Sequence, residues 1–223
     1  SLKDANSPKS MNTHLHVLEP FSNLYRVWPA DILRNRIQSL IRVFLDRIID
    51  QRTGHFHLFF GEDWEVQSNM VSYGHDIEGA WLINEAAELI QDRDLITESR
   101  QRTLEMVNAV LREGIAPDNS VYYEKDLDTD TLHKERHWWV QAESMVGLLD
   151  ACKNQEDPSY YDEFLKIWNY IRQHVIDHRN GGWFGIIEDD GKPRSGEVKA
   201  GFWKCPYHNT RALIESIHRI REL

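Results

Sequence analysis

The apolar residues between positions 30 and 50 recur at steps of three and four, and basic residues occupy many of the positions between them. This spacing places the apolar side chains on one side of an α-helix and the arginines on the other. The pattern therefore predicts an amphipathic helix with one buried face and one solvent face. Similar one-sided patterns occur at residues 97–113 and 159–177. In the first of these helices the apolar positions are Leu33, Ile37, Leu40, Ile41, Phe44 and Ile48.

A second kind of segment is apolar around most of its circumference, which predicts a helix buried on nearly all sides. Such segments lie at residues 74–91, 136–153 and 206–219. Before each of them lies an aromatic stretch with turn residues, at residues 52–64, 116–125 and 180–191, which predicts a short hairpin or extended loop. The apolar residues of the first such helix are Ile77, Ala80, Trp81, Leu82, Ile83, Ala86, Ala87, Leu89 and Ile90.

These parts recur in the same order along the chain, which indicates an internal helical-hairpin repeat. The starts of the buried helices are spaced by about 65 residues and fall near Asn12, His75, His137 and Tyr207. Inner helices buried on all sides, outer helices exposed on one side and loops gathered at one end predict an all-α (α/α)6 toroid or barrel. An open solenoid is the alternative, but it needs polar capping repeats at its ends. Because the sequence starts inside a unit at Met11, we expect one domain, residues 1–223, that is the C-terminal portion of a longer ring without its N-terminal repeats.

The composition is that of an ordinary globular chain, with 41% hydrophobic and 28% charged residues. The formal net charge is −10 and the Lys and Arg residues form no block, so nucleic acid is not an expected partner. No apolar run reaches the roughly 20 residues that cross a bilayer, and the polar start of the chain lacks a signal-type apolar region. We therefore expect a cytoplasmic protein that does not bind a membrane.

Polar and aromatic side chains collect at the starts of the buried helices, where free backbone N–H groups face whatever the loops surround. Glu143 is the only charged residue between Trp138 and Leu149, and such a carboxylate must pair, hydrogen-bond or face water. Tryptophan faces stack on sugar rings and histidines transfer protons near neutral pH, so the set predicts a saccharide site. The candidates are Asn12, His14, His16, Glu19, His75, Asp76, Glu78, Trp81, His137, Trp138, Trp139, Glu143, Tyr207, His208, Asn209 and Arg211.

Other kinds of site have weaker support in the sequence. His14 and His16, together with His75 and Glu78, carry donor atoms for a metal ion, but the chain has no His-Glu-x-x-His motif, and we expect no metal. The glycines near residue 181 lack the strand-to-helix setting of a phosphate loop, so no nucleotide cofactor is expected. Cys205 is interpreted as a buried thiol, because as an activated nucleophile it lacks a base with an orienting partner.

Four blocks of the sequence resemble the signature blocks of one enzyme family. They are Asn12-Thr-His-Leu-His-Val-Leu-Glu19, Ser72-Tyr-Gly-His-Asp-Ile-Glu-Gly-Ala-Trp81, Arg136-His-Trp-Trp-Val-Gln-Ala-Glu143 and Trp203-Lys-Cys-Pro-Tyr-His-Asn-Thr-Arg-Ala212. The blocks are similar to those of the N-acylglucosamine 2-epimerase superfamily and, within it, most similar to those of the cellobiose 2-epimerases. The resemblance extends from Met11 to the end of the sequence and implies an isomerase whose (α/α)6 barrel is about twice as long as this chain.

The resemblance also implies roles for these residues. His75 and His208 would be the two acid/base groups that invert C2 of the reducing-end glucose of cellobiose, or of a similar β-1,4-linked disaccharide, through an enediolate. His16 would assist ring opening or hold the oxyanion, and no cofactor is implied. The implied substrate-binding residues are Asn12, Glu78, Trp81, Trp138, Trp139 and Glu143, with the tryptophans stacking on sugar rings.

Alternatives remain open at this stage. One alternative is another activity of the same superfamily: the enzyme would then epimerise N-acylglucosamine or isomerise mannose to a ketose, and would not act on cellobiose. A glycoside hydrolase on the same toroid would use Glu78 and Glu143 as acid and base but would leave the histidines without a role. A third class is a catalytically silent sugar-binding protein. The family also places an oxyanion-stabilising arginine in an N-terminal half, so we expect this chain alone to be a poorly soluble, inactive partial barrel unless the missing repeats are supplied by a second segment.

Overall fold

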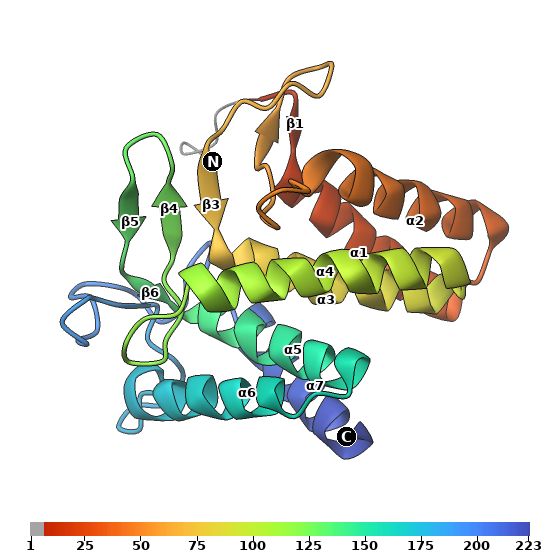
Figure 1. Cartoon of the computed structure of the whole chain (residues 1–223). Helices are drawn as coiled ribbons and strands as arrows, with labels where there is room; N and C mark the ends of the chain where they lie inside the picture. Colours follow the sequence, from red (N-terminus) through yellow and green to blue (C-terminus); the bar gives the residue numbers. More distant parts are fainter. Residues whose placement is uncertain (1–6) are drawn as a thin grey trace.

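The computed structural model describes residues 7–223, and its helices form an inner and an outer layer (Figure 1). The inner helices are α1 (Met11–Val27), α3 (Tyr73–Ile90), α5 (Trp138–Gln155) and α7 (Tyr207–Glu222). The outer helices are α2 (Asp31–Val43), α4 (Arg93–Glu113) and α6 (Ser159–Tyr170). Helix α3 packs on α1 and α5, and α5 packs on α7, while α2 lies on α1 and α3, α4 on α3, and α6 on α5. The predicted all-α hairpin repeat is therefore confirmed.

The observed helix limits lie within a few residues of those predicted. Helix α4 begins four residues before its predicted start, because the side chain of Asp92 accepts a hydrogen bond from the Leu95 N–H at 3.2 Å and caps the helix there. Two outer helices end in a π turn that the hydrophobic period does not predict. These turns are Phe44–Ile48 after α2 and Ile171–Val175 after α6.

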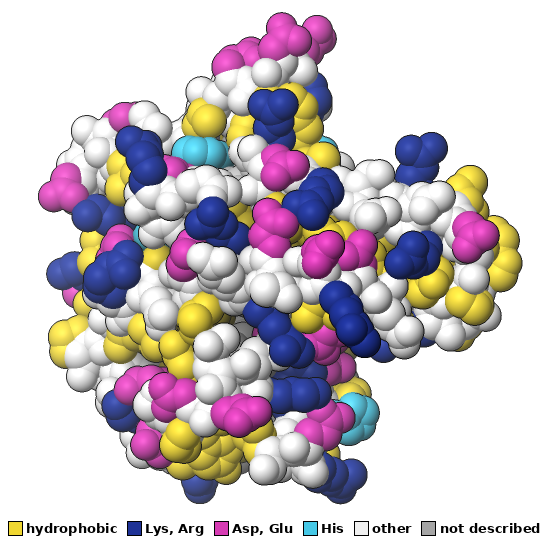
Figure 2. Space-filling model, turned by 45° about the vertical axis from the view of Figure 1, so that its right-hand side comes forward, with side chains coloured by type: hydrophobic (Ala, Val, Ile, Leu, Met, Phe, Trp, Pro, Cys, Tyr) yellow, Lys and Arg dark blue, Asp and Glu magenta, His cyan; other side chains and the backbone are white. Residues whose placement is uncertain are grey.

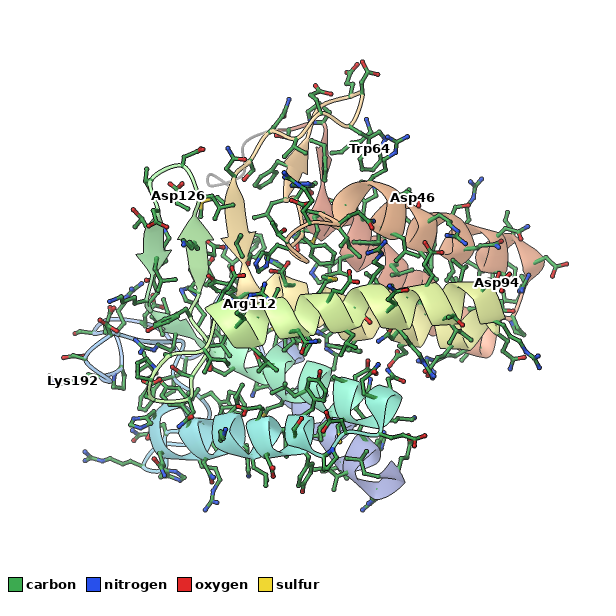
Figure 3. The ribbon with its side chains drawn as sticks, viewed as in Figure 1. Asp46, Trp64, Asp94, Arg112, Asp126 and Lys192 are labelled. Carbon is green, nitrogen blue, oxygen red and sulfur yellow. The ribbon has the colours of Figure 1, made fainter. Side chains whose placement is uncertain are left out.

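Short strands lie between the helices, and three of them lead directly into an inner helix. Strand β1 (Lys9–Ser10) precedes α1 and pairs with β2 (Phe59–Phe60). Strand β3 (Met70–Ser72) precedes α3 and joins β4 (Glu124–Asp126) and β5 (Thr131–His133) in an antiparallel sheet. Strand β6 (Arg136–His137) precedes α5 and pairs with β7 (Ile186–Ile187). The β4–β5 hairpin extends away from the helices, with Asp126 labelled near its tip in Figure 3.

An isolated β-bridge follows each outer helix within the described residues. The three bridges are Ile49–Phe56, Ile115–Val121 and Ile176–Trp183. They confirm that the segments after the outer helices are extended. The predicted 180–191 segment also ends in a turn, where the Glu188 N–H donates to the Lys192 carbonyl at 2.8 Å.

The core confirms part of the burial prediction and corrects the rest. Helices α3 and α5 are buried around most of their circumference, as predicted. Helix α7 buries only Ala212 and Ser216, and Ile217 on the same helix is 52% exposed. The prediction for α7 was therefore wrong, because α3 and α5 have inner neighbours on two sides whereas α7, among the described residues, packs mainly on α5.

The surface carries charges of both signs. Acidic and basic side chains are interspersed over the face shown in Figure 2. No helix within residues 7–223 is long and apolar enough to span a bilayer.

The loop before α7 differs from the strands that precede the other inner helices. It is held by Lys204, whose ammonium group donates to the carbonyl oxygens of Trp183 and Lys199 at 2.8 Å each. Cys205 in this loop is exposed, so the prediction of a buried thiol was wrong: the apolar residues around it lie on a loop and not against the core.

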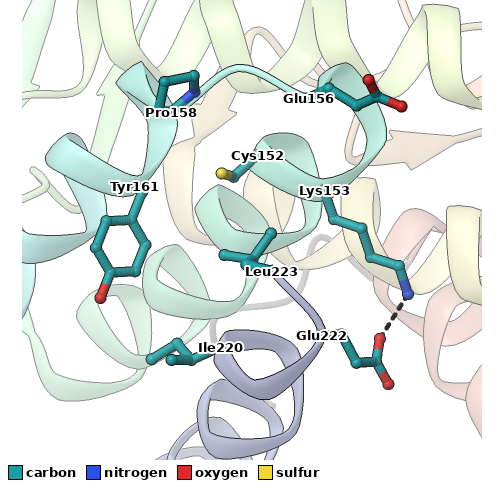
Figure 4. A pocket seen from close by; sticks show the side chains of 8 residues that line it. All are labelled: Cys152, Lys153, Glu156, Pro158, Tyr161, Ile220, Glu222 and Leu223. Atoms are coloured by element: carbon teal, nitrogen blue, oxygen red, sulfur yellow. Dashed lines mark hydrogen bonds and ion pairs between the residues drawn. The ribbon is translucent and has the colours of Figure 1, made fainter.

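A cavity of about 610 Å³ lies between α5, α6 and the end of α7 (Figure 4). It is lined by Cys152, Tyr161 and Ile220, among others, and Lys153 pairs with Glu222 at its edge at 2.7 Å. The lining residues lie near the C-terminal ends of α5 and α7 and at the start of α6, whereas the predicted site residues lie near the N-terminal ends of the inner helices. The cavity is therefore separate from the predicted site.

Candidate active site

Arg211, in the second turn of α7, connects all four inner helices through side chains in their first three turns. Its guanidinium group donates to Glu19 of α1 at 2.6 Å, to Glu78 of α3 at 2.6 Å and to Glu143 of α5 at 2.7 Å. The Tyr207 hydroxyl donates to the second carboxylate oxygen of Glu19. We call the group the Arg211 cluster; it consists of Arg211, Glu19, Glu78, Glu143, Tyr207 and His208.

Two carboxylates of this cluster are buried and share the positive charge of Arg211. The side chains of Glu78 and Glu143 are 1% and 0% exposed. Burial opposes the ionised form of Glu143, but the hydrogen bond from His208 and the charge of Arg211 lower its pKa. Burial and the charge of Glu143 raise the pKa of Glu78. Glu143 is therefore the more strongly ionised member of the pair.

Two carboxylates of the cluster occupy the same position in successive repeats. Glu78 and Glu143 are each the sixth residue of an inner helix, α3 and α5. His208 follows Glu143 by 65 residues but is the second residue of α7, about one helical turn nearer the helix start. The two glutamates are therefore equivalent in the repeat, and His208 reaches them from a different position.

His208 is oriented by a carboxylate. Its Nδ1 lies 2.7 Å from Glu143 Oε1, and because an ionised carboxylate only accepts hydrogen bonds, Nδ1 carries the proton. Its ring centroid lies 5.6 Å from that of Trp139. The Nε2 atom is left as the nitrogen that can exchange a proton with a bound molecule.

His75 is the second histidine whose ring lies beside Trp139. Its Nδ1 is 2.8 Å from the Ser72 hydroxyl, and its ring centroid is 4.8 Å from that of Trp139. Burial, together with the positive charge of His16 and His208, lowers the pKa of His75 well below its ordinary value. His75 is therefore a neutral imidazole at neutral pH, which is the form of a base.

The remaining predicted histidines divide into two groups. His16 lies 3.4 Å from Glu19, and this hydrogen bond raises its pKa against the opposing effect of burial. His14 bonds to the Ser10 carbonyl at 2.7 Å and packs on Trp64, and His137 stacks on Tyr123 with ring centroids 3.7 Å apart. His16 thus adjoins the cluster, whereas His14 and His137 contact other parts of the protein.

The predicted substrate-binding residue Asn12 is exposed in the first turn of α1.

The three predicted sugar-stacking tryptophans have different surroundings. Trp81 is 2% exposed, donates to Glu143 at 3.1 Å, and has the guanidinium groups of Arg211 and Arg219 over its ring at 4.9 and 5.5 Å. A sugar has no open face of Trp81 to stack on, so this part of the prediction was wrong, and Trp81 orients Glu143 instead. Trp138 is 9% exposed, whereas Trp139 is half-buried. Of these three tryptophans, Trp139 therefore has the most open surface.

Sequence reasoning singled out Arg211 but gave it no role. The signal that could have found one is charge balance, because two carboxylates on buried helices require a nearby cation. Asp76 was also a candidate, yet its side chain bonds to His55 and not to the cluster. Neither the role of Arg211 nor the contact of Asp76 with His55 follows from the spacing of residues along one helix.

One subset of the cluster has the composition of a metal site. Donor atoms of Glu78, Glu143 and His208 lie within 4.8 Å of one another. The Arg211 guanidinium group, however, already bonds to both carboxylates, so the protein itself supplies the positive charge that a metal ion would bring. These residues do not fit a resident metal ion.

The fold and the site together define a class of protein: an arc of an α/α toroid with a centre of histidines, carboxylates and one arginine at the N-terminal ends of its inner helices. The chain belongs to the N-acylglucosamine 2-epimerase (GlcNAc 2-epimerase) family, whose model matches residues 2–212.

Several relatives share a more specific name. The chain is 43% identical over 96% of its length to the cellobiose 2-epimerase of Bacteroides fragilis, of which the match covers 55%. It is 35% identical to that of Dictyoglomus turgidum over 95% of its length, covering 54% of the relative. The solved structure of the Bacillus thermoamylovorans cellobiose 2-epimerase superposes with a TM-score of 0.89 at 39% identity, over 94% of this chain and 53% of that one. The chain thus spans about half the length of the curated relatives it matches.

Proposed function

We propose that the protein is a sugar 2-epimerase that inverts C2 of the reducing-end glucose of cellobiose or a similar β-1,4-linked disaccharide. Membership of the epimerase family supports the reaction. The cellobiose 2-epimerase names of the relatives support the substrate. Since the chain spans about half of those relatives, the proposal is made for the complete natural protein.

The observation that carries the proposal is the pair of histidines on Trp139. Their ring centroids lie 4.8 Å (His75) and 5.6 Å (His208) from that of the tryptophan. In both rings Nδ1 contacts the protein, and the hydrogen bonds of the two rings within residues 7–223 do not involve Nε2. Inversion at C2 needs one group to remove a proton and a second group to deliver one to the opposite face. Two imidazoles with available Nε2 atoms supply that pair.

In the proposed reaction the sugar ring opens first, which makes the C2 hydrogen acidic because the aldehyde at C1 accepts the electron pair. Neutral His75 takes the C2 proton, and the electrons of the C–H bond move into the enediolate. Protonated His208 then donates its proton to the opposite face of C2, and the ring closes. In the reverse direction the two histidines exchange roles. His16, with its raised pKa, is suited to hold the negative oxygen of the enediolate.

Unpaired polar atoms at the site support sugar binding. Glu78 Oε2 and Trp138 Nε1 are buried and have no hydrogen-bond partner among the described residues. A carboxylate oxygen and an indole N–H are suited to bind sugar hydroxyl groups as acceptor and donor. We propose that these two atoms contact the substrate, that Trp139 stacks on one sugar ring, and that Asn12 binds near the reacting end.

The test is incubation of the complete protein with cellobiose in heavy water. Deuterium at C2 with an intact glycosidic bond is the expected result. Release of glucose would indicate a hydrolase, a ketose product would indicate an isomerase, and unchanged sugar would leave a binding protein. Replacing His75 or His208 by Asn should lower turnover by about 10²–10⁴-fold, the usual contribution of positioned proton transfer. Near-normal turnover in either variant would remove that histidine from the proposed role.

A further inference from the structure

Asp76 follows His75 directly in α3, yet its side chain forms a separate buried contact. Asp76 is 0% exposed. Its Oδ1 accepts a hydrogen bond from the Phe56 N–H at 2.8 Å, and its Oδ2 accepts one from His55 Nδ1 at 2.7 Å. The proposed C2 chemistry does not use this carboxylate. Burying it must therefore serve another purpose, because an ionisable group in the interior is costly unless it is paired.

His55 extends this contact to the end of α4. His55 is 5% exposed, and its Nε2 lies 3.2 Å from Glu113 Oε2. Glu113 is the last residue of α4 and follows Arg112, which Figure 3 labels at that end of the helix. Burial opposes a charged imidazole, but the hydrogen bonds and charges of Asp76 and Glu113 raise the pKa of His55. The chain Asp76–His55–Glu113 thus ties the first turn of α3 to the last turn of α4.

The segment that carries His55 has little room to move. The Phe56 ring packs on α3 at Gly79, where an added Cβ would lie 2.3 Å from ring atoms. Gly54 has a φ of +78°, and an added Cβ there would lie 2.9 Å from the Glu105 carbonyl oxygen of α4. Asp76 is therefore bonded to a backbone segment that is closely packed between two helices.

Corresponding contacts occur in the other two repeats. Gln141 of α5 accepts from the Val121 N–H at 2.9 Å and donates to its carbonyl at 2.7 Å. Lys204 donates to the Trp183 carbonyl. In each case a polar side chain at or before the start of an inner helix binds the backbone of the bridge residue that precedes it. Unlike Asp76, Gln141 does not adjoin a proposed acid/base histidine.

We propose that Asp76 and His55 are positioning residues for His75, which they hold in place by fixing the first turn of α3 against the 54–56 segment. The kinetic part of this inference rests on the proposed epimerase function. Adjacent Cα atoms are about 3.8 Å apart, so a shift of Asp76 is passed to its neighbour. A misplacement of about 1 Å lowers the rate of a positioned reaction by about 100-fold.

Two substitutions of Asp76 separate the hydrogen-bonding role from the charge. Asp76→Ala removes both bonds, and we expect kcat for C2 exchange to fall by about 100-fold while KM for cellobiose stays within about twofold. Asp76→Asn retains the contacts, because its oxygen accepts from the Phe56 N–H and its amide donates to His55 in the other tautomer, whose Nε2–H then donates to Glu113. Its kcat should stay within about threefold of wild type, since the geometry is kept.

Asn84→Ala is the matched control. Asn84 lies on the same helix, is buried, and bonds to Asp150 at 2.8 Å and to Thr103 at 3.0 Å. Its loss should weaken α3 without moving its first turn, so kcat should be unchanged. Equal losses of kcat in Asp76→Ala and Asn84→Ala, or wild-type kcat in Asp76→Ala, would overturn the proposal.

A second measurement does not depend on activity. The ¹⁵N resonances of the His75 ring report its tautomer and surroundings. They should shift in Asp76→Ala and remain in place in Asp76→Asn and Asn84→Ala. If the wild-type protein exchanges no C2 hydrogen, the proposed function fails. The ¹⁵N resonances would still show whether Asp76 holds the His75 ring in place. Should Asp76→Ala not fold, His55→Gln replaces it, with the same expected fall in kcat at unchanged KM and the same shift of the His75 signals; wild-type values would overturn the proposal.

Discussion

Replacing Arg211 by Met removes the positive charge that Glu78 and Glu143 share. Both carboxylate side chains are almost inaccessible to water, at 1% and 0% exposed. Removing one partner of a buried ion pair costs about 3–5 kcal/mol, because the remaining charge has neither water nor a counter-ion. In a chain of this size each 1 kcal/mol lowers the melting temperature by roughly 2–4 °C. The variant should therefore melt on the order of 10 °C below the wild type at neutral pH.

The direction of the pH dependence also follows from the cluster. In the wild type the lowered pKa of Glu143 contributes stability above the unfolded-state value of 4.5, and this contribution is lost as pH falls through the lowered pKa. Removing Arg211 takes away a charge that lowers the pKa of both carboxyl groups, while burial continues to raise it, so both pKa values should rise. The folded variant then binds protons more tightly than the folded wild type, and its stability relative to the wild type falls as pH rises through those values. The difference between variant and wild type should therefore be smaller near pH 5 than near pH 7.

Urea denaturation followed by tryptophan fluorescence at the two pH values measures this difference. Arg42→Met is the matched control, because Arg42 pairs with Glu98 at 2.5 Å but the two side chains are 42% and 40% exposed. An exposed pair contributes less than about 1 kcal/mol, so the control should lose little stability at either pH. If Arg211→Met loses no more stability than the control, or loses the same amount at both pH values, the buried-charge argument is wrong.

Three further outcomes are expected. Trp139→Ala should raise KM for cellobiose more than for mannose, because a disaccharide offers a second ring for stacking; equal effects on both sugars would contradict that role. Gly79→Ala should lower the free energy of unfolding by about 1–3 kcal/mol, since the added Cβ would lie 2.3 Å from the Phe56 ring, and denaturation at unchanged m-value measures it. Dialysis against a chelator should leave activity unchanged, because Arg211 supplies the positive charge of the cluster; activity that is lost and then restored by a divalent ion would refute this.

The hydrophobic period of the sequence was sufficient to predict the helical hairpins and their order. It reports which face of a helix is apolar, and α3 and α5 are buried as that pattern indicates. It does not report how many neighbours a helix has, so α7 was predicted to be as buried as α5. The hydrophobic period also does not predict the π turns after α2 and α6, since these turns change the period only at the last turn of each helix.

The candidate site was predictable to the extent that it depends on position within a repeat. His16, Glu78, Glu143 and His208 lie near helix starts and do come together around Arg211. The function of each side chain depends on contacts between distant segments. Arg211 is 133 residues from Glu78, and no local pattern indicates that its guanidinium group would cover Trp81. For the same reason the contact of Asp76 with His55 was not predicted.

The matching positions of Glu78 and Glu143, each the sixth residue of its helix, have a consequence for how the centre is assembled. Helices arranged around a common axis direct successive copies of one sequence position toward that axis from different directions. A carbon atom held on the axis is then accessible from several sides without a loop folding back across it. Replacing one copy by an uncharged residue, as at Ala212 in the sixth position of α7, alters the charge near the axis by one unit and leaves every backbone path as it was. Rotational pseudo-symmetry thus lets the chemistry of the centre diverge helix by helix while the scaffold stays constant.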